Sequence, residues 1–216
     1  MKGSKLDLCL NMGYFRMQQD IFTCQYILFE NKLCPVYWLR IVLADVTYGT
    51  KQLRLLRSND QFTVAVKPFV LSEELENLYA LYRSAINFDA PDSVESCLLD
   101  GAIDSVFDTY VVEVRDQGQL IAAGIFDDGF QSIAGIMNFY HPAYRKHSLG
   151  KFLMLQKINH ARRQRKIYYY PGYIAYNYTK FDYKIFPCEA ATELLDTHNG
   201  LWVPFSWDLL KTLSED

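Results

Sequence analysis

Hydrophobic positions follow strand and helix periods in successive blocks along the chain. Between residues 33 and 46, both alternating sets of side chains are mainly apolar, which is typical of a strand covered on both faces. Arg40 interrupts one of these sets, and a charged side chain at a covered position needs a partner. With a second strand-like block over 14–30 and turn residues at Asn31-Lys32, this region predicts a β-hairpin.

Helical periods and start signals mark four further blocks in the first half of the chain. Ser72 precedes an acidic first turn and a stripe of apolar residues, which predicts a capped helix. A second short helix is expected over 93–99, and an N-terminal helix over 4–13 with Ser4 as its cap. Residues 47–60 favour a basic helix, followed by a short strand over 62–66.

Three strand-like runs then follow closely, at 109–115, 119–126 and 132–140, with turn residues between them, which predicts an antiparallel meander. A helix from Ser148 and a strand over 167–174 put a parallel pair into the sheet. Another helix and a last strand near 201–205 complete the order. We therefore expect an α/β (α+β) protein with a mixed, bent sheet flanked by helices.

Two parts are expected within this architecture. Residues 1–70 form a smaller N-terminal α/β subdomain of helix, hairpin, basic helix and strand, and residues 71–216 form the larger domain.

Charge is distributed unevenly along a chain whose net charge is only −3. From Glu73 to Asp116, eleven acidic residues face two basic ones, whereas residues 130–180 hold no Asp or Glu and nine Lys or Arg. Such asymmetry indicates an oriented electrostatic surface, and the basic stretch calls for an anionic partner.

Composition excludes several classes of protein. Half of the 216 residues are hydrophobic, which is enough for a core, yet no apolar run approaches the roughly 20 residues of a membrane span. The N-terminus lacks the features of a secretory signal, so we expect a cytoplasmic protein without a membrane partner. Five widely spaced cysteines without a CxxC pair favour buried free thiols, and no metal site is expected.

The start of the helix near Ser148 is the first candidate for chemistry. Ser148 is a suitable N-cap, Gly150 leaves room for a close approach, and backbone amides at Leu149 and Gly150 would face a bound anion. Arg145, Lys146, His147 and Lys151 surround them. Farther upstream, Lys51, Arg54 and Arg57 would share one helical face, either as a solvated face or as a phosphate-contacting ridge.

The segments FYHPAYRKHSLGKFLMLQKINHAR, YYYPGYI and TKFDYKIFP, within residues 139–187, resemble the C-terminal domain of the aminoacyl-tRNA–protein transferases. This family comprises the arginyl- and leucyl-transferases of the N-degron pathway. Fainter similarity extends to LNMGYFRMQQDIFT, CPVYWLRIVL and KQLRLLRSNDQFTVAV in the N-terminal half. The resemblance implies a GNAT-like domain, in which two neighbouring strands splay apart.

The resemblance also implies an activity, the transfer of Arg or Leu from aminoacyl-tRNA to the N-terminal amine of a protein with an acidic first residue, without a cofactor. The implied catalytic candidates are Tyr140, His141 and Tyr183. The donor and its tRNA would be held by Arg145, Lys146, Ser148, Leu149, Gly150, Lys151 and the residues Lys51, Arg54 and Arg57. The acceptor would be held by Tyr173, Lys180 and Lys184.

Three departures from the family pattern keep alternatives open. His141 stands where the family generally has Asp, and it is either a general base or a structural loop residue. The N-terminal cysteine cluster is reduced to Cys34, and Pro171 replaces a Leu beside Gly172. An acyl-CoA-dependent N-acetyltransferase, which the missing glycine-rich loop disfavours, and a non-catalytic tRNA- or N-degron-binding paralogue are the alternatives.

Overall fold

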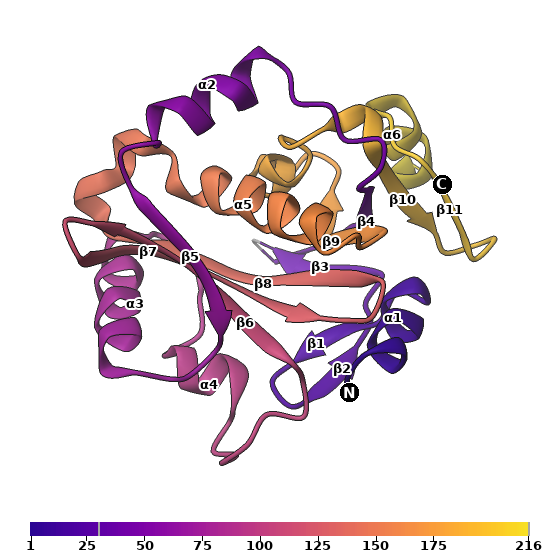
Figure 1. Cartoon of the computed structure of the whole chain (residues 1–216). Coiled ribbons are helices and arrows are strands. Elements are labelled where there is room, and N and C mark those ends of the chain that lie inside the picture. Colours follow the sequence, from indigo (N-terminus) through magenta and orange to yellow (C-terminus); the bar gives the residue numbers. More distant parts are fainter. Residues whose placement is uncertain (30, 216) are drawn as a thin grey trace.

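The computed structural model describes residues 1–29 and 31–215, and one nine-stranded sheet runs through it (Figure 1). Its elements follow one another in this order: α1 (Ser4–Asn11), β1 (Phe15–Met17), β2 (Asp20–Phe22), β3 (Tyr26–Phe29), β4 (Lys32–Val42), α2 (Thr50–Ser58), β5 (Thr63–Pro68), α3 (Glu73–Ala85), α4 (Val94–Leu98), β6 (Thr109–Asp116), β7 (Gln119–Asp128), β8 (Ser132–Tyr140), η1 (Pro142–His147), α5 (Leu149–Arg163), β9 (Tyr168–Ala175), η2 (Thr179–Lys184), η3 (Glu189–Ala191), β10 (Thr192–Asp196), β11 (Leu201–Pro204) and α6 (Trp207–Glu215). The η elements are 3₁₀ helices.

The predicted meander and parallel pair are both present. Strands β5 to β8 are antiparallel neighbours, β8 pairs with β9 in parallel, and α5 connects the two. The mixed, bent sheet flanked by helices is thus confirmed.

The strand order is β11-β10-β4-β9-β8-β7-β6-β5, with β3 pairing beside β4. Strand β4 therefore lies between β9 and β10, although it comes from the first 70 residues of the chain. The proposed subdomain boundary at residue 70 falls between β5 and α3, and strands from both sides of it share the sheet.

Helices cover both faces of the meander because its side chains alternate. Val112 and Val114 of β6 pack with α5 and α2 on one face, and Val111 packs with α3 and α4 on the other. Figure 1 shows α5 crossing one face below α2, with α3 and α4 on the other side. Two further apolar clusters join α1 and α6 to β4, β9 and β10.

Several boundaries differ from the sequence-based expectation. The block 14–30 is not one strand, because Gln18 adopts a φ of 56° and turns the chain back between β1 and β2. Its last residue, 30, lies outside the described part. Gly3 precedes α1 in the cap position, and Ser4 makes no cap there. After β9 the chain forms short 3₁₀ helices and β10 in place of an α-helix, and α6 was not predicted.

Arg40 has the partners that its covered position requires. Its Nε lies 2.6 Å from Oε2 of Glu193, and Nη1 donates to Oδ1 of Asn11 at 2.9 Å. The guanidinium also stacks over the rings of Tyr168 and Trp202. Among the described residues, none of the helices combines the length and the apolar character that a membrane span needs.

Candidate active-site cleft

A cleft opens where β8 and β9 separate. The two strands pair only from Ser132 with Tyr168 to Ala134 with Tyr170, and beyond these residues they diverge. On the β9 side Gly172 has a φ of +99°, and a Cβ there would lie 3.1 Å from Nζ of Lys184. The cleft lies along the part of β8 beyond this pairing and has a volume of about 590 Å³.

The walls of the cleft come from several parts of the chain. Helix α3 and the loop after it supply aromatic rings, β8 supplies one edge, and α4 and η1 supply Cys97 and Arg145. The start of α5 and the 3₁₀ helix η2 supply the rest. The lining includes the aromatic residues Tyr79, Tyr82, Phe88, Tyr140, Phe181 and Tyr183. Its cations are Arg145, Lys151 and Lys180, and its one carboxylate within the described residues is Asp89. The cleft therefore suits a partly aromatic or apolar ligand that carries negative charge.

The first turn of α5 lies at the cleft, but the side chain of Ser148 does not cap the helix as predicted. Ser148 occupies the N-cap position in the left-handed region, at φ 51°, and its side chain makes no cap hydrogen bond. Gly150 faces the cleft, and a Cβ added there would meet only the Tyr140 ring, at 3.7 Å. The Leu149 side chain is buried in the core, so only the backbone of this residue is available to a ligand.

Neighbouring residues Tyr140 and His141 point to different places. Tyr140 lines the cleft, whereas His141 borders a separate shallow pocket beside Glu73 and Glu74. Nδ1 of His141 accepts a hydrogen bond from the Ala143 amide at 3.2 Å, which makes His141 the N-cap of η1. A carboxylate accepts the same kind of bond at an N-cap. The structure thus explains the exchange of Asp for His without a catalytic role.

The residues predicted on η2 divide into two groups. Lys180 lies in the cleft, with Nζ 3.8 Å from the Phe88 ring centroid, and burial lowers its pKa while Asp89 opposes the shift. Tyr183 also lines the cleft, and burial raises the pKa of its hydroxyl to about 12. A phenol with this pKa donates hydrogen bonds at neutral pH and does not serve as a base.

Lys184, the last residue of η2, and Tyr173 of β9 do not border the cleft. Nζ of Lys184 donates to the Tyr173 carbonyl at 2.7 Å and lies 4.6 Å from the centroids of the Tyr173 and Phe181 rings. Burial, and to a smaller degree Lys180, lowers the pKa of Lys184 to about 7. Direct contact between Lys184 and an acceptor is therefore not part of this arrangement.

A basic surface leads from α2 to the cleft. Lys51, Arg54 and Arg57 are exposed, and within residues 1–29 and 31–215 none of them forms an ion pair. The buried Asn59, at the end of α2, donates to the His147 carbonyl at 3.1 Å. This bond ties the helix to η1, which carries Arg145 and Lys146. We call the exposed bases Lys51, Arg54, Arg57, Arg145 and Lys146 the basic ridge.

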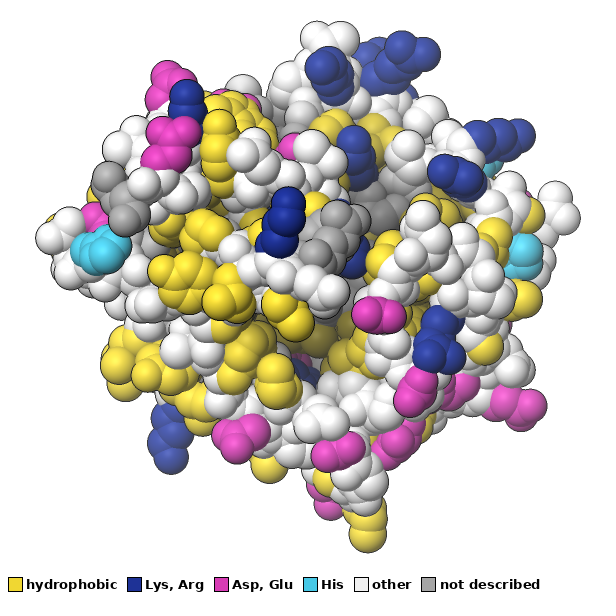
Figure 2. Space-filling model, turned by 180° about the vertical axis from the view of Figure 1, so that it is seen from behind, with side chains coloured by type: hydrophobic (Ala, Val, Ile, Leu, Met, Phe, Trp, Pro, Cys, Tyr) yellow, Lys and Arg dark blue, Asp and Glu magenta, His cyan; other side chains and the backbone are white. Residues whose placement is uncertain are grey.

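Figure 2 shows the molecule from behind, and Lys and Arg gather at its upper right, on the side where α2 lies. Asp and Glu gather along the lower right, on the side of α3 and α4. The charge asymmetry of the sequence thus becomes an asymmetry of the surface. It favours an anionic ligand that approaches from the α2 side.

A cysteine thiol lies in the cleft, and the described residues hold no cluster of metal-ligating side chains. Cys97 lines the cleft, and burial raises the pKa of its thiol to about 11, so it is protonated at neutral pH. Within the described ranges, no three His, Cys, Asp or Glu side chains converge as metal ligands would.

The predicted site omitted several residues that line the cleft, and Asn138 of β8 is one of them. It also omitted Lys157 of α5, which is buried behind the cleft with Nζ 2.8 Å from Oδ1 of Asn138. The available signal was Lys157 itself, a charged residue in the otherwise apolar i, i+4 series of Leu149, Leu153 and Ala161.

Comparison with known proteins gives a consistent result. Residues 74–186 match the family described as "Arginine-tRNA-protein transferase, C terminus". An aspartate/glutamate leucyltransferase of Pseudoalteromonas atlantica is 29% identical over 152 residues, which are 68% of this chain and 64% of the relative. One of Xanthobacter autotrophicus is 29% identical over 202 residues, which are 85% and 78% of the two chains.

Among solved structures, L-PGS from Bacillus licheniformis aligns with a TM-score of 0.50 and 13% identity. The alignment covers 83% of this chain and 53% of that one. At this identity the likeness concerns the fold alone.

Proposed function

The chain belongs to the family of the arginine-tRNA-protein transferase C-terminal domain, and we propose that it transfers an amino acid from aminoacyl-tRNA to the N-terminal amine of a protein. The observation that carries this proposal is the continuity of the basic ridge with the cleft. A tRNA whose phosphates lie along α2 and η1 can direct its 3′ end toward the start of α5.

The reaction balances without a further reactant. The neutral α-amine attacks the ester carbonyl carbon, the amide C–N bond forms, and the bond between that carbon and the ribose oxygen breaks. The proton lost by the amine ends on the ribose oxygen that leaves. Because ester and amine react directly, positioning and charge stabilisation supply the catalysis, and no cofactor is needed.

The side chains of the cleft favour leucine over arginine as the transferred residue. A guanidinium would meet Arg145, Lys151 and Lys180, with Asp89 as the one compensating carboxylate among the described lining residues. The apolar surface of Tyr79, Tyr82 and Ile136 suits a leucyl side chain. The names of the bacterial relatives agree with this choice.

For the acceptor, Lys180 is the cation best placed to pair with an acidic first residue. Its ammonium is partly buried in the cleft beside Phe88, where an ion pair with a carboxylate is screened less than at the surface. We therefore propose Asp or Glu as the accepted N-terminal residue, in agreement with the relatives' names. Such a reaction belongs in the cytoplasm, where charged tRNA is present, and would feed an N-degron pathway.

The test is a transfer assay with competing donors. The protein is incubated with radiolabelled Leu-tRNA, Arg-tRNA or acetyl-CoA and with matched peptides that begin with Asp, Glu, Asn or Lys. We expect label to move from Leu-tRNA to the Asp and Glu peptides. Transfer from acetyl-CoA alone would establish the N-acetyltransferase alternative, and salt-sensitive tRNA binding without transfer would establish a binding paralogue.

A further inference from the structure

Strand β8 carries one residue more than its partner β7 at the edge of the cleft. Ile125 pairs with Met137 and Phe126 pairs with Gly135, so that Ile136 has no opposite residue. This is a β-bulge, and a bulge leaves backbone groups without ladder partners and redirects the side chains beside it.

The ammonium of Lys157 occupies the bulge. Its Nζ donates to the carbonyl of Ile125 at 2.7 Å, to the carbonyl of Met137 at 3.1 Å and to Oδ1 of Asn138 at 2.8 Å. An ammonium has three N–H donors, and each finds an acceptor here. The side chain is 1% exposed, so these bonds are not shared with bulk water.

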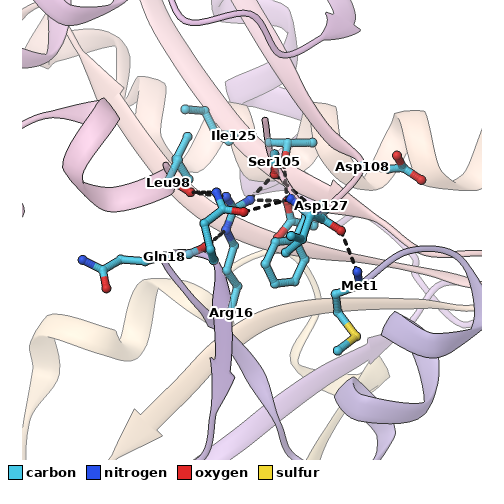
Figure 3. Close-up of polar contacts among 12 residues, drawn as sticks. Met1, Arg16, Gln18, Leu98, Ser105, Asp108, Ile125 and Asp127 are labelled. Atoms are coloured by element: carbon cyan, nitrogen blue, oxygen red, sulfur yellow. Dashed lines mark hydrogen bonds and ion pairs between the residues drawn. The ribbon is translucent and has the colours of Figure 1, made fainter. Parts of the chain in front are cut away.

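The nearest charged groups to Lys157 are Asp127 and, beyond it, Arg16. Burial lowers its pKa to about 7, and the carboxylate of Asp127 opposes this shift. Asp127 in turn accepts from Nη1 of Arg16 at 2.8 Å and from Oγ1 of Thr109 at 2.7 Å. Figure 3 shows Arg16 with its contacts to Gln18, Leu98 and Asp127.

Lys157 determines which way the Asn138 amide faces. In its protonated form Lys157 donates and cannot accept, so the oxygen of the Asn138 amide points toward it. The NH₂ group then points away from the core, toward the Gly150 carbonyl at 3.5 Å, at the start of α5. Because this contact is long, the NH₂ group remains able to bind a ligand in the cleft that Asn138 lines.

We propose that Asn138 donates a hydrogen bond to the carbonyl oxygen of the aminoacyl ester and that Lys157 is the positioning residue that fixes the donor. This inference rests on the proposed function. The carbonyl oxygen gains negative charge as the amine adds, so a preorganised N–H there stabilises the transition state more than the bound substrate.

The first experiment compares wild type, Asn138→Ala and Asn138→Asp in steady-state transfer from Leu-tRNA. Asn138→Asp keeps the size of the side chain and its bond to Lys157 but offers no N–H. Asn77→Ala, an exposed amide on α3, is the matched control. We expect both Asn138 variants to lose about 100-fold in kcat, with KM for tRNA within about threefold of wild type, and the control to be unchanged.

The second experiment is a double-mutant cycle with Lys157→Gln. A glutamine carbonyl can accept from the Asn138 NH₂ group, so the amide is free to turn around. We expect about a tenfold loss in kcat for Lys157→Gln alone and no further loss when it is added to Asn138→Ala. Multiplying losses would show that Lys157 does not act through Asn138.

These experiments distinguish a failure of the Asn138 role from a failure of the proposed function. If wild type transfers leucine and either Asn138 variant stays within about threefold of its kcat, the inference is wrong while the function stands. If wild type transfers no amino acid from any charged tRNA, the proposed function fails first, and the donor role of Asn138 falls with it.

Discussion

Replacing Lys51, Arg54 and Arg57 together by Gln is predicted to weaken tRNA binding and to reduce its dependence on salt. The three side chains are exposed on α2, and within the described chain they have no ion-pair partner that would compete with phosphates. A protein that neutralises phosphates releases about 0.7 to 0.9 counterions per contact, and the logarithm of its affinity falls with the logarithm of salt concentration in proportion.

If each side chain makes one phosphate contact, the slope becomes shallower by about two to three. Between 50 and 200 mM salt, wild type should then lose about 20- to 40-fold more affinity than the variant does. Because glutamine keeps the length and helix propensity of the side chains, the fold of α2 should be unaffected.

The assay is fluorescence anisotropy of a labelled, uncharged tRNA at several salt concentrations. A variant with Lys5, Lys32 and Lys211 replaced by Gln removes the same charge from α1, β4 and α6 and serves as the control. It should retain the wild-type slope to within about one. Equal slopes for wild type and the α2 variant would contradict tRNA binding by α2, because Lys51, Arg54 and Arg57 would then form an ordinary solvated helix face.

Three further predictions concern stability and the residues near the cleft. Replacing Arg16 by Met removes the ion-pair partner of the buried Asp127 carboxylate and should lower the free energy of unfolding, measured by urea titration, by about 3 to 5 kcal/mol. The same change at the exposed Arg83 should cost at most about 1 kcal/mol, and equal costs would show that the buried ion pair is no stronger than the exposed one. Lys184 has a pKa near 7 in the folded protein, so it loses its proton as the pH rises through 7, whereas the unfolded chain keeps that proton up to about pH 10. Wild-type stability relative to Lys184→Met should therefore rise with pH, by about 1.4 kcal/mol per pH unit between about pH 8 and 10, and a constant difference would count against the shifted pKa. His141→Asp should keep the cap of η1, whereas His141→Ala should lower the free energy of unfolding by about 1 kcal/mol, and both variants should retain aminoacyl transfer. Loss of transfer at unchanged stability would show that His141 is catalytic.

Local chemistry made much of the fold predictable. The turn at Gln117-Gly118 has both residues at positive φ, 47° and 88°, as a tight hairpin between β6 and β7 requires. Ser72 caps α3 by accepting from the Leu75 amide, as its position before the acidic turn indicates. Features of this kind depend on a few neighbouring residues, and the sequence displays them directly.

Long-range pairing was not predictable in the same way. Nothing in the alternation of β4 states that it inserts between β9 and β10, because a strand covered on both faces fits any interior place in a sheet. The reversal at Gln18 was missed because glutamine carries no turn signal, and its positive φ is imposed by the pairing of Met17 with Asp20.

The sequence predicted which segments of the chain form the cleft, but it did not predict which of their side chains point into it. Tyr140, Arg145, Lys180 and Tyr183 do line the cleft. His141 points elsewhere because successive side chains at the end of a strand face opposite sides. Lys184 is buried because the turn of η2 directs it toward the Tyr173 carbonyl. Such directions follow from tertiary packing rather than from spacing along the chain.

The most direct test of the central claim is a single-turnover reaction of the protein with Leu-tRNA and a peptide that begins with Asp, analysed by tandem mass spectrometry. The account predicts one added leucine, joined through an amide bond to the α-amine, together with release of uncharged tRNA. A peptide with an acetylated N-terminus should remain unmodified. If the Asp peptide is recovered unchanged while the tRNA stays charged, the account is contradicted.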